Sequence, residues 1–199
     1  NLSLSEIQPN PKLLFPSIDF SKFEIKNIDD WLLNNNINNK RKVLIVNAHA
    51  KSGQSDNFIM SKMIEDLATQ FPETLFLVTN DEFDEYGKKT NILNKENIIF
   101  TNDIIKKNKC DLNEIAYLST HCDLIVGRAT GAFSFATNQV NFFERKIKII
   151  CFSNLIPTTP NKFWLSSLMS DKMEYSSEII VSNETDIVKN KSLIEGYLI

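Results

Sequence analysis

Residues 43 to 57 read VLIVNAHAKSGQSDN, and this stretch indicates the fold class. It begins with a continuous apolar run of mostly β-branched residues, which predicts a strand that is covered on both faces. A polar loop follows, and apolar residues then recur at spacings of four, three and four, namely Met60, Ile64, Leu67 and Phe71. Such spacing is typical of an amphipathic helix, which we expect between Ser55 and Phe71.

The same order of elements recurs along the rest of the chain. Short apolar runs predict further strands at 74–79, 97–101, 123–127, 146–152 and 178–182. We expect helices that begin at Asp111, where Glu114 completes a capping-box pattern, near Ala132, where the helix continues to Phe143, and near Thr185. Strands that alternate with helices predict an α/β fold, a Rossmann-like parallel sheet of about six strands with helices on both faces.

Residues 1 to 40 differ in composition from the rest. Prolines at 9, 11 and 16 disfavour helix, and the run NNNINNK at 34–40 is polar. We therefore expect an irregular N-terminal lead-in or linker segment over 1–40, followed by a nucleotide-binding domain over 41–199. Within the segment, IDDWLL at 28–33 predicts one short helix whose apolar side chains could pack on a neighbouring surface.

Composition narrows the range of functions. The formal net charge of −3 does not favour non-specific binding to nucleic acid or to anionic membranes. Three cysteines without a CxxC pair argue against a disulfide framework and favour a reducing compartment, so we expect a cytoplasmic protein. No apolar run approaches the roughly 18 residues that a transmembrane helix needs.

Glycine is rare in this chain, with only 5 among 199 residues. Three of these glycines lie in two loops that join a strand to a helix, NAHAKSGQSDN at 47–57 and GRATGAF at 127–133. Each loop carries one cation and hydroxyl side chains. Because ligands of open parallel sheets bind at the carboxyl ends of the strands and anions favour helix N-termini, these loops are a candidate phosphate site. A purely structural role of glycine in such turns is the alternative.

The chain lacks both GxxxxGK[ST] and GxGxxG, which disfavours a Walker site and the usual dinucleotide turn. His49 lies in the first loop, where it could transfer a proton or bind a phosphate, or could simply be solvated. His121 follows a predicted helix, a position that favours a structural role. A metal site built from His121, Cys122 and Cys110 would need a ligand spacing that the sequence does not show.

The order strand, SGQS, amphipathic helix, strand, and then DLNEIAYLSTHCDLIVGRATGAFSF at 111–135 resembles the C-terminal, donor-binding half of GT-B glycosyltransferases, most nearly the heptosyltransferase type. The resemblance covers about residues 41–155. It implies a Gly/Thr-rich turn that presents backbone amides to a nucleotide diphosphate. The donor-binding residues that it implies are Lys51, Ser52, Gly53, Gln54, Arg128, Thr130 and Gly131, with His49 as the candidate catalytic residue.

The resemblance implies a nucleotide-diphosphate sugar as donor, transfer of the sugar to an acceptor hydroxyl, and no required metal or other cofactor. The sequence departs from the family pattern in two respects. No acidic residue that could hold the ribose occurs between Ala132 and Phe143, and only about 40 residues precede the first predicted strand. We therefore expect the acceptor half to be absent, or to be supplied by a second Rossmann half or a partner protein.

Two other functions fit the same residues. One is a non-catalytic α/β binding or scaffold module for a phosphorylated ligand or a protein partner. The other is a small enzyme with a flavodoxin-like sheet that binds a mononucleotide, for which the loop from Ser52 to Ser55 would be the phosphate site. Nucleotide binding separates these alternatives.

Overall fold

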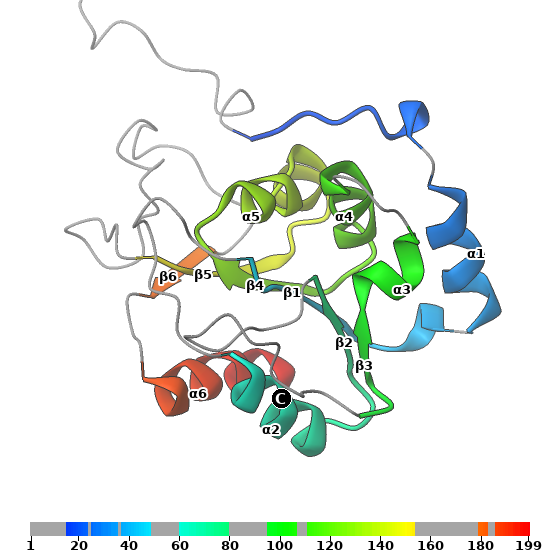
Figure 1. Ribbon diagram of the computed structural model, residues 1–199. Helices are drawn as coiled ribbons and strands as arrows, with labels where there is room; N and C mark the ends of the chain where they lie inside the picture. Colours follow the sequence, from blue (N-terminus) through cyan, green and yellow to red (C-terminus); the bar gives the residue numbers. More distant parts are fainter. Residues whose placement is uncertain are drawn as a thin grey trace, which may run out of the picture.

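The computed structural model describes residues 15–23, 25–35, 37–48, 60–79, 95–106, 111–153, 179–182 and 186–199. Within these ranges one parallel sheet of six strands runs through the molecule (Figure 1). Its strands are β1 (Lys42–Val46), β2 (Leu75–Val78), β3 (Ile98–Phe100), β4 (Leu124–Arg128), β5 (Lys148–Phe152) and β6 (Ile179–Ser182). The fold prediction is confirmed, and each strand lies within two residues of its predicted bounds.

The strand order is β3-β2-β1-β4-β5-β6, and every pair of neighbours is parallel. The chain therefore builds the sheet outward from β1 to β3 and then returns to the other side of β1 to build β4, β5 and β6. The order reverses between β1 and β4, where Val46 lies opposite Gly127. In open parallel sheets this reversal creates a crevice at the carboxyl ends of the two strands.

Helices cover both faces of the sheet (Figure 1). They are α1 (Lys26–Asn34), α2 (Ser61–Gln70), α3 (Thr101–Ile105), α4 (Leu112–Ser119), α5 (Gly131–Ala136) and α6 (Ile187–Leu198), with short helices η2 (Phe20–Lys22), η3 (Ile37–Asn39) and the π-helix η4 (Val140–Glu144). In β1, Val43 and Ile45 pack toward α2 and α6, whereas Leu44 and Val46 pack toward α1, α4 and α5. Successive residues of a strand face opposite sides, so a continuous apolar run fills both layers of the core.

The predicted helix from Ala132 to Phe143 is wrong. The helix α5 ends at Ala136, and the π-helix η4 follows after a break. Two side-chain amides explain the break: Asn138 Nδ2 donates to the carbonyl of Phe135 at 3.2 Å, and Asn141 Nδ2 donates to the carbonyl of Ala136 at 2.8 Å. Asparagine side chains compete with the backbone for such carbonyls, which ends the regular helix.

The capping-box prediction is also wrong. Asp111 precedes α4 but makes no side-chain capping hydrogen bond, and Glu114 is buried with 2% of its surface exposed. The N-cap half of the pattern is therefore missing, because the Asp111 side chain does not accept a hydrogen bond from the first turn of α4. The helix α3 occupies a region where the sequence predicted no helix.

Part of the N-terminal segment packs on the core. Phe15 stacks on Phe142 with ring centroids 4.1 Å apart, and the backbone N–H of Gln139 donates to the carbonyl of Pro16 at 3.0 Å. The predicted short helix is present as α1, whose Ile28 and Leu32 are buried. These contacts attach Phe15, Pro16 and α1 to the face of the sheet that carries α4 and α5. In the parts of the chain that the structure describes, no helix is long and apolar enough to span a bilayer.

Candidate functional site

Arg128 and Asn47 meet at the point where the strand order reverses. Arg128 is the last residue of β4, and Asn47 directly follows β1. The guanidinium Nη1 of Arg128 donates a 2.6 Å hydrogen bond to the side-chain oxygen of Asn47. Only 3% of Arg128 and 4% of Asn47 is exposed. The switch point thus holds a buried guanidinium, one nitrogen of which is held by the side chain of Asn47.

Buried polar residues continue along the same edge. The amide of Asn47 donates to Thr79 Oγ1 at 3.1 Å, and Thr101 Oγ1 donates to the carbonyl of Thr79 at 3.4 Å. Each of the first five strands ends in, or is directly followed by, one such residue, in the order Asn47, Thr79, Thr101, Arg128 and Ser153. We call this set the carboxyl-edge row. It consists of hydroxyl, amide and guanidinium groups, and each of its five residues is at most 4% exposed.

Sequence reasoning singled out Arg128 but missed the other four members of the row. A signal for them exists, because each one stands at the end of a short apolar run. Polar residues at such positions are common, however, and the sequence alone does not show that parallel pairing brings five of them to one edge.

The second predicted loop contains two glycines with different roles. A Cβ added at Gly127 would lie 2.8 Å from the Val46 carbonyl oxygen and 2.8 Å from the Phe133 ring. Gly127 is therefore required for the close packing of β1, β4 and α5. At Gly131, the first residue of α5, an added Cβ would meet nothing within 4 Å. Packing does not require glycine at position 131, whereas close approach of a ligand to the backbone would.

Of the remaining predicted site residues, the structure describes Thr130 but not the five that belong to the first loop. Thr130 is the N-cap of α5, and its Oγ1 accepts a 3.2 Å hydrogen bond from the amide of Phe133. Phe133 itself is buried in the core on the α4 and α5 side of the sheet. The predicted residues of the first loop lie outside the described residues, namely His49, Lys51, Ser52, Gly53 and Gln54. Their loop starts from β1, directly beside the strand that leads into the second loop.

His121 has the surroundings of a structural residue. Its ring packs edge-on against Tyr117 with centroids 5.0 Å apart. Burial, followed by the nearby charge of Arg145, lowers the pKa of His121 from its ordinary value, so the neutral ring is favoured. Cys122 and Cys151 are buried free thiols, and Cys110 lies outside the described residues. In the described ranges, no group of three potential ligand side chains could hold a metal ion.

No protein-family model matches this chain, and no curated protein matches it. Among solved structures, the chain is similar to the crystal structure of a glycosyl transferase family 9 protein from Veillonella parvula DSM 2008, with 10% sequence identity and a TM-score of 0.45. The match covers 86% of this chain and 43% of that one. The chain therefore spans less than half the length of the structure it matches.

Proposed function

We propose that this chain is a nucleotide-diphosphate-sugar-binding domain of a glycosyltransferase, with the diphosphate held at the carboxyl edge between β1 and β4. The observation that carries the proposal is the hydrogen bond between Arg128 and Asn47 at 2.6 Å, across the reversal of the strand order. It supports the proposal because the crevice at such a reversal is where Rossmann-like sheets bind nucleotides, and the guanidinium is held there in place.

The neighbouring turn supports the same ligand. The first amides of α5, those of Gly131 and Ala132, lie outside the helical hydrogen-bond ladder and can donate to an anion. The space beside Gly131 allows a phosphate to approach the backbone. Arg128 would supply the positive charge, and Lys51 of the first loop would add a second cation.

In the proposed reaction, an acceptor hydroxyl attacks the anomeric carbon of the donor sugar. A bond forms from the acceptor oxygen to that carbon, the bond from the carbon to the phosphate oxygen breaks, and the nucleoside diphosphate leaves with the bonding electrons. His49 would take the hydroxyl proton. Arg128 and the amides of the second loop would stabilise the charge that develops on the leaving diphosphate, so the scheme requires no metal. The acceptor would bind to a second Rossmann half or a partner.

A non-catalytic scaffold module is the second candidate. It is favoured by the fact that the Arg128 guanidinium and the Thr130 hydroxyl both take part in hydrogen bonds within the protein. In this case the carboxyl-edge row would only stabilise the fold, and the protein would not respond to nucleotides.

Calorimetric titration with a panel of nucleoside diphosphates separates the two candidates. We expect micromolar binding of at least one nucleotide, and a thermal shift, since a ligand at 100 times its Kd adds about 2.7 kcal/mol to stability. Gly131→Val should weaken binding without loss of stability, because the new side chain meets open space. Lys62→Gln, which removes an exposed cation of α2, is the matched control and should bind normally. Absence of binding by the whole panel would overturn the proposal.

A further inference from the structure

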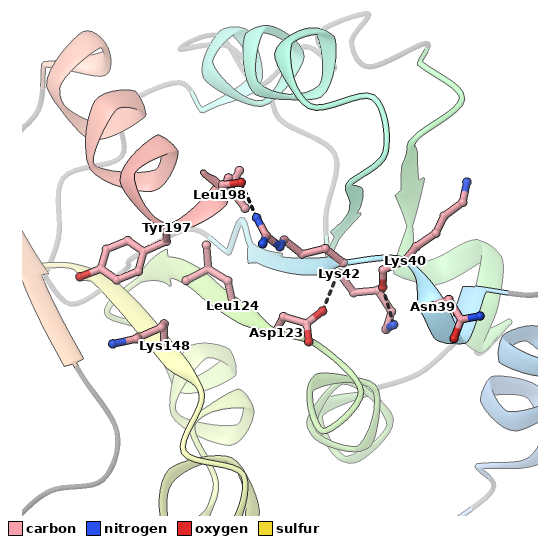
Figure 2. Close-up of a pocket in the computed structure, with 9 residues that line it drawn as sticks. Asn39, Lys40, Lys42, Asp123, Leu124, Lys148, Tyr197 and Leu198 are labelled. Carbon is pink, nitrogen blue, oxygen red and sulfur yellow. Dashed lines mark hydrogen bonds between the residues drawn. The ribbon is translucent and has the colours of Figure 1, made fainter.

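The amino ends of the strands border a cavity of about 480 Å³, but its charged side chains do not converge on one ligand. Figure 2 shows Lys40 and Lys148 extending away from each other. The carboxylate of Asp123 accepts a 2.8 Å hydrogen bond from the backbone amide of Lys42, which joins the starts of β1 and β4 (Figure 2). That contact serves the fold and gives the cavity no common binding point.

A smaller cavity lies between α1 and α3, which are next to each other in the molecule (Figure 1). We call it the α1–α3 pocket. Its volume is about 230 Å³, and the Nδ2 of Asn27 on α1 joins its two walls by a 3.3 Å hydrogen bond to the carbonyl of Ile105 on α3. Pockets for drug-sized ligands start at about 300 Å³, so this one suits a molecule with a single ring. Its lining includes Asn27, Trp31, Asn34, Asn35, Asp103 and Lys106.

Trp31 provides the α1–α3 pocket with an aromatic surface. The side chain is partly buried and packs against the core on the α4 and α5 side of the sheet. Within the described ranges, its indole N–H donates to no other residue. A ring that core contacts hold in place offers a ligand apolar area at a low entropic cost, together with one hydrogen-bond donor.

Three side-chain amides surround the ring. Asn27 donates through Nδ2 to the carbonyl of Ile105, and Asn35 donates through Nδ2 to the carbonyl of Trp31 at 2.8 Å. These bonds use the amide nitrogens and leave the two side-chain oxygens as acceptors. Among the described residues, the side chain of Asn34 takes part in no hydrogen bond, so it can both donate and accept. Hydroxyl groups also donate and accept, and amides are therefore suitable partners for them.

The charges of the α1–α3 pocket balance. The carboxylate of Asp30 forms an ion pair with Lys26 one turn earlier on α1. In the part of the chain that the structure describes, the side chains of Asp103 and Lys106 form no ion pair and no hydrogen bond. One anion and one cation remain, so the pocket has no excess charge that would select an ionic ligand. A neutral molecule with many hydrogen-bonding groups fits this balance.

The backbone does not explain why residue 106 is lysine. Lys106 ends α3 in the left-handed conformation, with a φ of 53°. This conformation is unfavourable for residues with a Cβ, whereas glycine adopts it freely. The side chain is exposed, and its ammonium group has no partner among the described residues. A contact between the ammonium group and a ligand would account for a side chain at this position.

We propose that the α1–α3 pocket binds a neutral sugar, one ring of which lies on Trp31. Sugar hydroxyls would donate to the carboxylate of Asp103 and to the side-chain oxygens of Asn27 and Asn35. Other hydroxyl oxygens would accept from the indole N–H and from the Lys106 ammonium group. Of the described residues that line the pocket, none belongs to the carboxyl-edge row, so this site is separate from the proposed donor site and does not depend on nucleotide binding.

Tryptophan fluorescence of the full chain tests the proposal. The chain has 2 tryptophans, and Trp164 lies outside the described residues. The variant Trp164→Phe therefore leaves Trp31 as the single reporter. The probes are the methyl α-D-glycosides of glucose, galactose and mannose. We expect at least one of them to change the Trp31 emission in a saturable way, with a millimolar Kd.

Two variants in the Trp164→Phe background test the polar contacts. Lys106→Gly should weaken glycoside binding about threefold to tenfold, the effect of one lost hydrogen bond. Its thermal stability should not fall, because a φ of 53° suits glycine, so a folding defect would not obscure the result. Asp103→Asn should also weaken binding, because the carboxylate is the stronger acceptor. Lys62→Gln, which removes an exposed cation of α2, is the matched control and should bind normally.

Several results would overturn the inference. One is a constant Trp31 emission with all three glycosides at tens of millimolar. Another is unchanged affinity in both Lys106→Gly and Asp103→Asn, or an equal loss in Lys62→Gln. A response to free glycine but to none of the glycosides would show that the pocket takes a zwitterion instead of a sugar. Conversely, glycoside binding that persists in Gly131→Val would support the inference even if no nucleoside diphosphate binds.

Discussion

The side-chain oxygen of Asn47 accepts a 2.6 Å hydrogen bond from Arg128 across the boundary between β1 and β4, although the two residues are 81 positions apart in the chain. This contact joins the two halves of the sheet at their carboxyl ends. It also fixes the direction of the one cation that the described residues place in the carboxyl-edge row.

The contact should be visible in a double-mutant cycle. We expect Asn47→Ala to lower the free energy of unfolding by about 1.5–3 kcal/mol, because it leaves a buried charged donor without this partner. Arg128→Met should also destabilise, and the double variant should lose less than the sum of the two. Urea denaturation measures all three. Strict additivity would show that the hydrogen bond contributes nothing to stability.

Substitution of alanine for each of the two glycines of the second loop should have different effects on stability. Gly127→Ala forces a methyl group to within 2.8 Å of Val46 and Phe133, so we expect a loss of about 1–3 kcal/mol from overpacking. Gly131→Ala meets open space in the first turn of α5 and should be neutral, or stabilising by at most about 1 kcal/mol. Thermal melts of both variants test this pair, and a large loss with Gly131→Ala would contradict it.

The contact between α1 and α4 should weaken at alkaline pH. Tyr117 donates a 2.7 Å hydrogen bond to Asp29, and burial together with this bond raises the pKa of Tyr117 to about 12. An unfolded tyrosine has a pKa of about 10. The stabilisation is therefore complete below pH 10 and is lost as the pH rises toward 12.

Absorbance titration of the phenolate measures this directly. Tyr117→Phe should remove a phenol that ionises near pH 12 and lower stability at neutral pH. It should also reduce the additional loss of stability between pH 10 and 12. If the variant and the parent chain lose stability equally over that range, the hydrogen bond to Asp29 is not responsible.

The buried thiols should be inert in the folded protein. Burial raises the pKa of Cys122 and of Cys151 to about 12, so very little thiolate is present at pH 8. We expect iodoacetamide to modify neither residue until the chain is unfolded in urea, as followed by peptide mass spectrometry. Modification of either cysteine in the folded protein at the rate of a free thiol would rule out this environment.

The N-terminal aromatic contact should matter for stability. Phe15 is 5% exposed and stacks on Phe142, so Phe15→Ala should cost about 3 kcal/mol, at the lower end of the range for a buried phenylalanine. Leu33→Ala is the matched control, since that side chain is 69% exposed, and it should cost less than about 0.5 kcal/mol. Similar values for the two variants in urea would show that residues around Phe15 do not contribute to the core.

Sequence patterns predicted the elements that depend on local chemistry. The run at 43–46 and the spacing from Met60 to Phe71 produced β1 and α2 as expected, because burial of a strand or of one helix face requires those apolar positions. The same sequence patterns did not predict the helix break before η4, where side-chain amides from Asn138 and Asn141 interrupt the helix. A helical spacing of apolar residues does not reveal which carbonyls a neighbouring amide will reach.

The sequence by itself determined that apolar strands alternate with amphipathic helices, because the spacing of apolar residues decides which segments can bury one helix face or both faces of a strand. Only the tertiary structure decided that β1 lies between β2 and β4, and therefore that Asn47 and Arg128 touch. The same pairing gathers five buried polar residues at one edge of the sheet. Such juxtapositions depend on which strands become neighbours, and that choice is made by the packing of the whole core.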